Sequence, residues 1–562
     1  MNTVDKIWLK SYPVGVPAEI DTNTFANLVD LFMASVEKSR DKIVFSNMGV
    51  DLSYAEVEKK SAAFAAHLHQ AGIKAGDRVA IMSPNLLQYP IALFGALRLG
   101  CTIVNCNPLY TPRELEHQLN DSGATAIVVL ENFAVTLQEV LPRTSIKHVV
   151  ITSIGECVGL KGLLVNFVVR HVKKMVPAFS LPNAIRFSAA LANGAGKDFP
   201  KPTLNHHSIA FLQYTGGTTG VSKGAILTHG NLIANILQAE AWLNGGPEWP
   251  HPEVIIGALP LYHIFALSVC MFVYVKRGAQ IVLITNPKDI PNFIKTLSKY
   301  RFTMLPGVNT LFNALLNNAE FAKLDFSALR YGLGGGMAVQ RATAELWKKV
   351  TGTTLVEAYG LTETSPGLTI NPTTITEYNG TIGLPIPSTE IKIRLADGNT
   401  APLGERGEIC ARGPQVMQGY WQRPDETAKV LDKDGWFGTG DVGIMDEHGY
   451  CKIVDRIKDM ILVSGFNVYP NEVEDAVCMH PGVLEAAAIG LPDEKSGEAV
   501  KIFVVRKSSS LTTDELMSHC KEVLTGYKCP KHIEFRDELP KTNVGKILRR
   551  ALRDEALTKM KL

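Results

Sequence analysis

The sequence predicts an α/β fold, in which a large N-terminal lobe of βαβ-type sheets packed with helices is joined by a hinge to a small C-terminal α+β lobe. Three observations carry this prediction. Apolar runs of strand length alternate with stretches of helical spacing over most of the chain, and after Asp455 the pattern changes to shorter runs. The third is length: 562 residues exceed a single core, because a domain usually holds about 150 residues.

The large lobe shows the alternation most clearly. An apolar run closes on a turn at 76–85, and a stretch of helical spacing follows it at 86–100. Strands that alternate with helices indicate largely parallel sheets, whose ligands bind at the loops after the strands. Further runs of strand character occupy residues 124–131, 148–153, 254–260, 279–285, 302–307 and 329–336.

The small lobe contains two apolar runs at 484–490 and 499–505, then a helical stretch at 513–524 and a last strand at 532–536. A separate unit of about a hundred residues is an ordinary domain size. We therefore expect a large lobe over residues 1–455, a hinge at 456–458 and a mobile small lobe over 459–562.

Charge and cysteine content narrow the classes of function. Lys and Arg number 57 and Asp and Glu 55, which gives a net charge of +2, so a nucleic-acid partner is not expected. The nine cysteines are scattered and form no C-x-x-C pair, which favours a reduced cytoplasmic compartment. The N-terminal residues lack the apolar core of an export signal, and export is not expected.

One long apolar run raises the question of a membrane span. Residues 254–275 carry no formal charge, and a run of this length is able to cross a bilayer. Pro260 and His263 near its middle oppose a continuous helix. We therefore expect a strand, a turn and a buried helix, with a channel or transporter component as the alternative.

Residues 161–176 have the spacing of an amphipathic helix. Asn166, Arg170, Lys173 and Lys174 fall on one face, and large apolar side chains occupy the rest. Two interpretations stay open. Either this basic amphipathic helix lies on an anionic membrane, or it packs on the core while its basic face is solvated.

A glycine-rich loop, YTGGTTGVSKG, spans residues 214–224. Glycines let backbone N–H groups approach an anion closely, and the hydroxyls and Lys223 add donors and a charge. A flexible surface loop would explain the glycines but not this combination. The usual phosphate loop, G-x-x-x-x-G-K-[ST], does not occur in the chain, so another nucleotide chemistry is needed.

Three further motifs suit a nucleotide site. In EAYGLTET, at 357–364, Tyr359 is suited to stacking on a base, Thr362 to donating to phosphate and Glu363 to holding Mg²⁺ through hard oxygens. In WFGTGD, at 436–441, Asp441 is suited to ribose hydroxyls. In PKTNVGKILRR, at 540–550, Lys546 follows a glycine turn. A plain loop and a charged surface tail are the simpler interpretations of the first and last.

Taken together, these motifs resemble the adenylate-forming superfamily of acyl-CoA synthetases, luciferase and peptide-synthetase adenylation domains. Residues 214–224 resemble its phosphate loop, 357–364 its adenine and magnesium motif, and 540–550 its catalytic-lysine motif. Residues 434–458 resemble the signature of fatty acyl-CoA synthetases, and the likeness to bacterial long-chain members runs from near the N-terminus to Ala556.

The resemblance implies two reactions in one site. A fatty carboxylate attacks the α-phosphorus of MgATP to form acyl-AMP and pyrophosphate, and the thiol of coenzyme A then displaces AMP. The implied site residues are, for catalysis, Lys546, Glu363 and His263, with Glu363 also binding the metal; for ATP and AMP, Tyr214, Thr215, Gly216, Gly217, Thr218, Thr219, Gly220, Lys223, Gly334, Gly335, Gly336, Glu357, Tyr359, Gly360, Thr362, Asp441 and Arg456; for the hinge, Lys458; and for the path of coenzyme A, Ser464, Gly465 and Phe466.

The resemblance thus predicts an ATP-dependent long-chain fatty acyl-CoA ligase that feeds β-oxidation. Its expected small molecules are fatty acid, ATP with Mg²⁺ and coenzyme A as co-substrate. Its expected place is the cytoplasm, in peripheral contact with the inner face of the cell membrane, and a homodimer is left open. The alternatives are a ligase for medium-chain or aryl acids and a nucleotide-binding regulatory protein that has lost catalysis.

Overall fold

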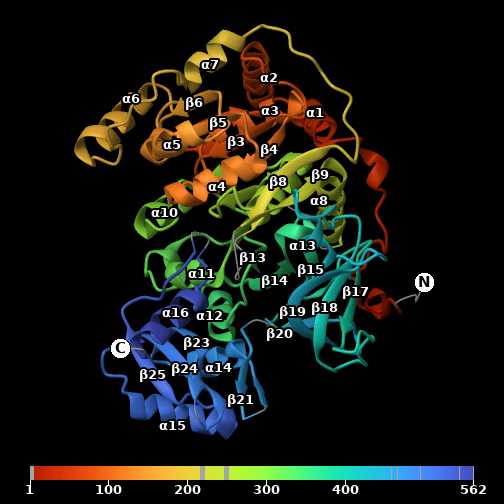
Figure 1. The fold of residues 1–562 in the computed structure, drawn as a ribbon, viewed down its shortest axis with the longest axis vertical. Helices are drawn as coiled ribbons and strands as arrows, with labels where there is room; N and C mark the ends of the chain where they lie inside the picture. Colours follow the sequence, from red (N-terminus) through yellow and green to blue (C-terminus); the bar gives the residue numbers. More distant parts are fainter. Residues whose placement is uncertain are drawn as a thin grey trace.

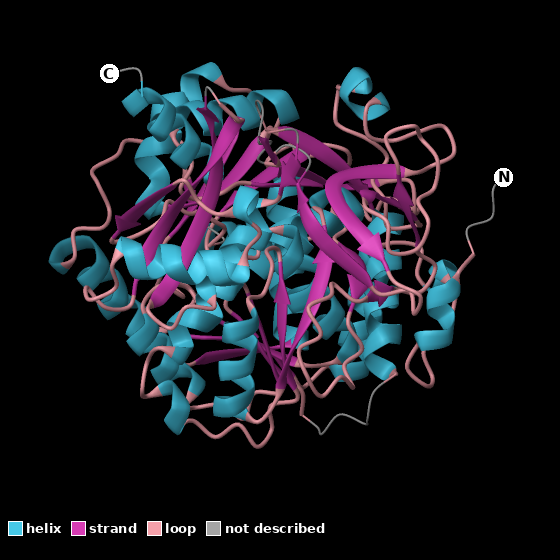
Figure 2. Cartoon of the chain, turned by 90° about the horizontal axis from the view of Figure 1, so that it is seen from below, coloured by secondary structure: helices cyan, strands magenta, loops and turns pink. Residues whose placement is uncertain are grey.

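The computed structural model of the chain describes residues 5–215, 222–245, 252–456, 459–464, 466–493, 495–542 and 545–560. Figure 1 shows a large lobe with three sheets and, at the lower end of the view, a small lobe with a fourth. In Figure 2 the strands run through the interior and helices lie around them. The predicted fold class is confirmed.

The first sheet follows the predicted βαβ pattern. Its strand order is β7-β6-β5-β3-β4-β8-β9, and all neighbours are parallel except β8 and β9. Its central strands are continuous buried apolar runs, as parallel strands covered on both faces require. The bounds are β3 (Arg78–Met82), β4 (Thr102–Asn105), β5 (Ala126–Leu130), β6 (His148–Thr152), β7 (Ile185–Arg186), β8 (Ile209–Thr215) and β9 (Lys223–Thr228).

The second sheet has the order β16-β15-β14-β13-β12-β10-β11-β1-β2. The strands from β14 to β1 are parallel, so their carboxyl ends meet at one edge. The bounds are β1 (Ile43–Asn47), β2 (Val50–Ser53), β10 (Val254–Gly257), β11 (Gln280–Leu283), β12 (Met304–Gly307), β13 (Tyr331–Gly335), β14 (Thr354–Gly360), β15 (Gly367–Ile370) and β16 (Leu384–Pro385).

The third sheet is antiparallel and completes the large lobe. Its last strand ends at Arg456, and the first strand of the small lobe begins at Ile461; Ile457 and Lys458 lie outside the described residues. The bounds are β17 (Glu390–Arg394), β18 (Gly407–Arg412), β19 (Phe437–Met445) and β20 (Cys451–Arg456).

The small lobe is built around one sheet with helices on both faces. Apolar residues of β23 and β24 pack on one side with α14 and α15 and on the other side with α16. Two faces of buried apolar residues give the lobe its own core. The strands are β21 (Ile461–Val463), β22 (Phe466–Val468), β23 (Val483–Asp493), β24 (Gly497–Arg506) and β25 (His532–Arg536).

Several helices begin at a residue whose side chain caps their first turn. At α2, for example, Ser53 and Glu56 form a capping box that satisfies free backbone N–H groups of the first turn. The α-helices are α1 (Leu28–Ser39), α2 (Tyr54–Gln70), α3 (Gln88–Arg98), α4 (Pro112–Ser122), α5 (Ala134–Val140), α6 (Leu160–Phe167), α7 (Phe187–Gly194), α8 (His229–Asn244), α9 (Val273–Arg277), α10 (Ile290–Leu297), α11 (Asn309–Leu316), α12 (Arg341–Thr351), α13 (Pro424–Ala428), α14 (Pro470–Cys478), α15 (Thr513–Val523) and α16 (Arg549–Met560).

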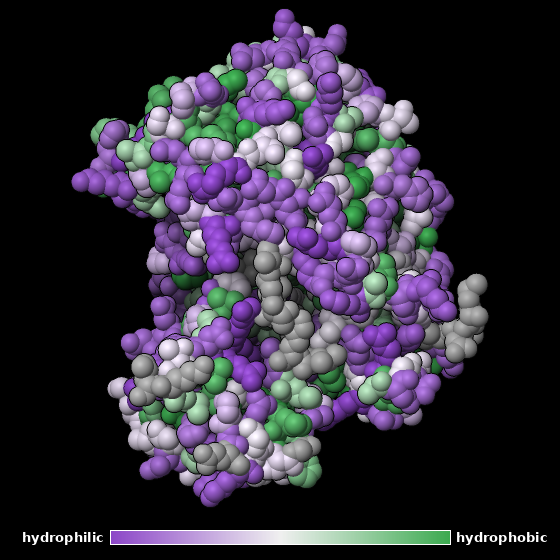
Figure 3. Space-filling view, viewed as in Figure 1, coloured by the Kyte–Doolittle hydropathy of each residue, from purple (hydrophilic) through white to green (hydrophobic). Residues whose placement is uncertain are grey.

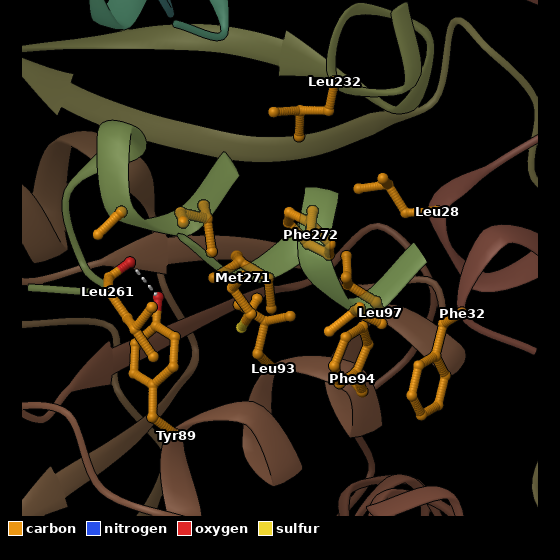
Figure 4. Close-up of a cluster of buried hydrophobic side chains, with 14 of the residues drawn as sticks. Leu28, Phe32, Tyr89, Leu93, Phe94, Leu97, Leu232, Leu261, Met271 and Phe272 are labelled. Carbon is orange, nitrogen blue, oxygen red and sulfur yellow. Dashed lines mark hydrogen bonds between the residues drawn. The ribbon is translucent and has the colours of Figure 1, made fainter. Parts of the chain in front are cut away.

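The uncharged run at 254–275 forms the buried strand β10, a turn and the π-helix η6 (Ala266–Phe272), which continues into α9. Figure 4 shows Met271 and Phe272 of η6 packed beside Leu93 and Leu97 of α3. The prediction of a strand, a turn and a buried helix is confirmed. Within the described ranges, no helix combines the length and apolar character that a membrane crossing needs.

The segment at 161–176 is helical, and the interpretation of a core-packed helix is wrong for it. Helix α6 continues into the π-helix η5 (Val168–Val172). Its large apolar side chains are exposed, with Leu163 at 71% and Phe167 at 56%. Arg170 turns inward and donates to both carboxylate oxygens of Glu131 at 2.8 Å. The expected basic outer face is therefore wrong for Arg170, and the apolar side does not pack on the core.

Candidate active site

A cavity runs along β13 and β14 and is bounded by the start of β12, helix α8, η6 and Lys546 of the small lobe. Much of its wall is apolar, including Phe265, Val269 and Ile370. Polar groups enter it from separate elements, among them His263, Thr362 and Lys546. An apolar cavity with a few convergent polar groups is the usual form of a small-molecule site.

Lys546 reaches this cavity from the small lobe. It lies beside Gly336, where an added Cβ would stand 3.5 Å from Cε of the lysine. The Lys546 backbone N–H donates to Oγ1 of Thr542 at 3.1 Å, and Thr310 of the large lobe donates to the carbonyl of Gly545 at 3.2 Å. The predicted catalytic lysine is thus held in the cavity by contacts on both sides of the lobe boundary.

His263 shares the cavity with Lys546 and is neutral there. Burial, together with the nearby charge of Lys546, lowers the pKa of His263 to about 3. Its Nδ1 accepts from the backbone N–H of Phe265 at 3.3 Å, which leaves the ring proton on Nε2. The imidazole is therefore a neutral hydrogen-bond donor beside a cation.

The glycines at the end of β13 allow close approach to the cavity. Gly335 and Gly336 line it, and Gly336 has a φ of +76°. An added Cβ at Gly335 would come within 3.0 Å of the Phe265 ring. Gly334, by contrast, packs against Val339 and is not part of the wall.

Tyr359, Gly360 and Thr362 line the cavity from the end of β14 and the turn after it. The Tyr359 hydroxyl donates to the buried carboxylate of Asp441 at 2.7 Å. In the register of β19 and β20, Asp441 lies opposite Arg456. The motif of Tyr359 and the motif of Asp441, about eighty residues apart in the sequence, are therefore in contact here.

Glu363 and Lys223 are linked through a residue that no predicted motif contained. The Tyr420 hydroxyl donates to the buried Glu363 carboxylate at 2.7 Å, and Lys223 Nζ lies 4.7 Å from the centre of the Tyr420 ring. Lys223 also donates to Glu426 at 2.7 Å, and this bond lowers the pKa of Glu426 to about 2. The only sequence signal for Tyr420 is its place in a Gly-Tyr-Trp triplet.

Two predicted nucleotide residues point away from the cavity. The Glu357 side chain accepts from the backbone N–H of Val339 at 3.0 Å, and burial raises its pKa to about 8. The Tyr214 hydroxyl donates to Asp121 at 2.7 Å. Neither belongs to the cavity wall, and in this arrangement both side chains contact other protein groups.

The rest of the phosphate loop is described only at its ends. Thr215 closes β8 and pairs with Lys223 at the start of β9. The predicted residues Gly216, Gly217, Thr218, Thr219 and Gly220 lie outside the described residues. The Arg456 backbone is placed in β20, but its side chain is not described.

The residues predicted for coenzyme A lie on the surface of the small lobe. Ser464 is exposed and has a φ of +51°, and Phe466 is 56% exposed and stacks on Tyr527 with ring centres 4.9 Å apart. Gly465 lies outside the described residues. The structure brings Lys546 to the cavity and leaves Ser464 and Phe466 away from it.

Glu363 is the residue that suits a magnesium ion. Among the residues that the structure describes, no three His, Cys, Asp or Glu side chains gather to form a metal cluster by themselves. A single oriented carboxylate still fits Mg²⁺, because this ion usually takes one or two carboxylates and completes its shell with substrate phosphates and water.

Comparison with protein families decides the assignment. The AMP-binding enzyme family matches residues 32–421, and the C-terminal domain of AMP-binding enzymes matches residues 472–546. The chain belongs to the AMP-binding enzyme family. The two matches fall on the large and the small lobe of this AMP-binding enzyme, and the predicted membership of the adenylate-forming superfamily is confirmed.

Full-length relatives of this AMP-binding enzyme are known from bacteria. A long-chain-fatty-acid–CoA ligase of Escherichia coli O6:H1 (strain CFT073) is 57% identical over 557 residues, 99% of each chain. One of Bacillus subtilis (strain 168) is 37% identical over 554 residues, 98% of each chain. The crystal structure of the anthranilate CoA ligase AuaEII with anthranoyl-AMP has a TM-score of 0.86 at 24% identity, over 97% of this chain and 100% of that one, which supports the fold.

Proposed function

We propose that this AMP-binding enzyme activates long-chain fatty acids to acyl-CoA with ATP, through an acyl-AMP intermediate. The observation that carries the proposal is the meeting of Lys546, Thr362 and neutral His263 in one mainly apolar cavity. Full-length similarity to bacterial ligases of that name supports the substrate class. An apolar wall suits an alkyl chain, and the polar groups suit its carboxylate and a nucleotide.

In the first half-reaction a carboxylate oxygen attacks the α-phosphorus of ATP, and the bond to the departing pyrophosphate breaks. Both reactants are anions, so their approach requires a fixed positive charge at the point where they meet. Lys546 supplies this charge inside the cavity. Its contacts with Thr542 and Gly336 hold it there before the substrates react.

His263 contributes a donor without contributing a second cation. Because its pKa is lowered to about 3, the ring is neutral at cellular pH and its Nε2–H remains available. A neutral donor is able to orient the fatty carboxylate without repelling Lys546 and without removing the carboxylate's nucleophilic charge. We assign this orienting role to His263.

Glu363 and Lys223 would bind the polyphosphate of ATP, Glu363 through the magnesium ion and Lys223 directly. Mg²⁺ bound with ATP supplies charge neutralisation of the polyphosphate. On the protein side, Glu363 would hold the ion, since its carboxylate is already oriented by Tyr420. Lys223, on the Tyr420 ring, would contact the β- and γ-phosphates. Asp441, held by Tyr359, and Arg456 would bind the ribose.

In the second half-reaction the thiol of coenzyme A attacks the acyl carbonyl, the acyl–phosphate bond breaks and AMP leaves. The nucleophile is a substrate group, and none of the described residues that line the cavity is a cysteine. We propose that the small lobe, residues 459–562, rotates about a hinge at 456–458 so that Ser464, Gly465 and Phe466 replace Lys546 beside the acyl-AMP.

We further propose that the enzyme works in the cytoplasm, at the inner face of the cell membrane, and supplies acyl-CoA for β-oxidation. Long-chain fatty acids partition into bilayers, so an enzyme that consumes them gains from contact with a membrane surface. A homodimer is compatible with this arrangement and is not required by it.

The test is release of AMP that depends on coenzyme A, measured with ATP and Mg²⁺ across a series of saturated fatty acids and aryl acids. The proposal expects the highest kcat/KM for long chains. If kcat/KM is highest for medium-chain or aryl acids, the proposed substrate class is wrong and those acids replace it. ATP binding without any acid-dependent pyrophosphate exchange would favour a regulatory protein and overturn the proposed activity.

A further inference from the structure

The outer side of α6 and η5 carries an unusual row of exposed apolar side chains. In α6 they recur at the spacing i, i+3, i+4 and i+7, which places them on one face of the helix. A surface helix normally turns such a face toward the core. The row, here called the apolar ridge, consists of Leu160 (89% exposed), Leu163 (71%), Leu164 (66%), Phe167 (56%), Val172 (65%) and Met175 (51%).

The inner side of the same segment is polar or small, and it fixes the orientation. At Gly162 an added Cβ would collide with the carbonyl of Gly155, so the two backbones are in direct contact. The Asn166 side chain accepts from the backbone N–H of Gly155 at 2.8 Å. Arg170 forms the two-pronged ion pair with Glu131, which is 1% exposed. A rotation that buried the ridge would break all these contacts and leave the buried Glu131 carboxylate with one of its two arginine partners, Arg186.

The charged side chains of the segment itself are positive, and two of them, Arg170 and Arg186, pair with the buried Glu131. Residues 157–197 contain six Lys and Arg and no Asp or Glu. Lys161, Lys173 and Lys174 are exposed beside the apolar side chains. A protruding apolar face bordered by lysines matches an anionic bilayer surface, with an apolar layer beneath negative headgroups.

We propose that the apolar ridge is the membrane-docking surface of this enzyme, where Leu163, Leu164 and Phe167 enter the acyl layer of an anionic bilayer and the neighbouring lysines contact its headgroups. The proposal deepens the proposed membrane contact and rests on it. Figure 1 places α6 toward the opposite end of the molecule from the small lobe, and the protruding corner of Figure 3 at this position mixes hydrophobic and hydrophilic residues. Docking there leaves the small lobe free to move.

The first experiment measures co-sedimentation of the full chain, without substrates, with vesicles of phosphatidylglycerol and phosphatidylethanolamine. The variant Leu163→Gln/Leu164→Gln/Phe167→Gln should bind on the order of a hundredfold more weakly, because three side chains lose their transfer from water. Changing Lys161, Lys173 and Lys174 to Gln should weaken binding at low salt about fivefold per lysine. Binding to pure phosphatidylcholine should be weaker for the wild type as well.

A matched control changes three exposed apolar residues elsewhere, Val14→Gln/Leu403→Gln/Met479→Gln, which are 96%, 56% and 60% exposed. It should bind vesicles as the wild type does. Circular dichroism and turnover of octanoate, a water-soluble fatty acid, check that the ridge variant is folded. Arg170 is left unchanged in all variants because it anchors the helix to Glu131.

A second measurement keeps the proposal testable if the triple variant fails to fold. Tryptophan fluorescence of Phe167→Trp, compared with the wild type, should shift to shorter wavelength on anionic vesicles and be quenched by brominated lipid tails. If the wild type binds vesicles and the ridge substitutions leave this binding unchanged, the apolar ridge is not the docking surface, although the enzyme does contact membranes. No binding by the wild type would overturn both. If the ridge variant instead abolishes a dimer in sedimentation velocity and binds vesicles normally, the ridge is a contact between two copies.

Discussion

Two loops of the small lobe are predicted to serve the same site, and the structure places them in opposite situations. The loop that carries Lys546 lies in the cavity beside Gly336. The loop that carries Ser464 and Phe466 lies at the surface, where Phe466 stacks on Tyr527. In this arrangement the small lobe therefore presents the loop of Lys546 to the cavity and leaves the loop of Ser464 and Phe466 away from it.

The difference has a physical reason. A cation needed between a carboxylate and a phosphate occupies the place where a thiol would have to approach the acyl carbonyl. The contacts that hold the small lobe in this arrangement include single hydrogen bonds such as those from Thr310 to Gly545 and from Asn313 to Leu484. Interfaces of this polar kind permit relative motion of domains. Under the proposed function, the described arrangement suits the first half-reaction, and the second half-reaction would require the other loop.

The largest effect is expected for Lys546→Ala. The variant should lose acyl-AMP formation by on the order of a hundredfold or more, because among the described residues that line the cavity no other is a cation that would offset the repulsion between carboxylate and α-phosphate. Supplied with synthetic acyl-AMP, it should still form thioester. Single-turnover pyrophosphate release and acyl-CoA formation measure the two steps. If Lys546→Ala adenylates near the wild-type rate, another residue supplies the positive charge between carboxylate and α-phosphate.

The next effect is expected for Lys458→Pro, which tests the proposed hinge. Proline fixes φ near −65° and restricts the residue before it, so the variant should hold one orientation of the small lobe. If that orientation is the adenylating one, pyrophosphate release survives while thioester formation falls at least about tenfold. Lys452→Pro, within β20, is the misfolding control and should impair both steps. Parallel loss of both steps in Lys458→Pro, or loss of neither, would remove the hinge assignment.

A smaller effect is expected for Tyr420→Phe, which removes only the hydroxyl that orients Glu363. A hydrogen bond to a charged group contributes about 1.5 kcal/mol or more, so the magnesium concentration for half-maximal adenylation should rise about tenfold. Calorimetry of MgATP binding gives a readout that does not depend on turnover. Thioester formation from supplied acyl-AMP should stay near wild type.

Tyr359→Phe is the matched control for Tyr420→Phe. It also removes one buried tyrosine hydroxyl from a carboxylate, here that of Asp441. It should raise the KM for ATP and leave the magnesium response unchanged. The same magnesium response in both variants would contradict a specific link from Tyr420 to the metal site.

The sequence predicted the residues of the site better than their orientations. Lys546 follows a glycine turn, which is a local signal, and the structure places it in the cavity as expected. Tyr214 and Glu357 belong to equally clear motifs, yet their side chains bind Asp121 and the backbone of Val339. Which face of a strand meets the cavity depends on the register of neighbouring strands, and local motifs do not contain that information.

The same limit applies to α6. Its periodicity predicts a helix with two faces, and the helix is present. The side that packs is decided by Glu131, a buried carboxylate 39 positions before Arg170. An amphipathic pattern has no information about such a partner, so the sequence could not decide between a helix on a membrane and a helix packed on the core.

The smallest effect is expected for Asn313→Ala, which weakens the docked arrangement through one hydrogen bond between the lobes. The Asn313 side-chain amide on α11 donates to the carbonyl of Leu484 on β23 at 3.1 Å. Such a bond contributes about 1 kcal/mol, which corresponds to about a fivefold shift between the two orientations. Adenylation should therefore slow by up to about fivefold, while thioester formation from supplied acyl-AMP should hold or rise.

The opposite signs of the two changes distinguish a shift of orientation from a general loss of stability. Asn120→Ala is the control, since the Asn120 amide donates to the carbonyl of Arg143 at 3.0 Å within the large lobe. Losing that bond leaves the boundary between the lobes intact, so both half-reactions should proceed at wild-type rates. If Asn313→Ala slows both steps equally, its hydrogen bond supports the fold of the enzyme and does not select between the two loops.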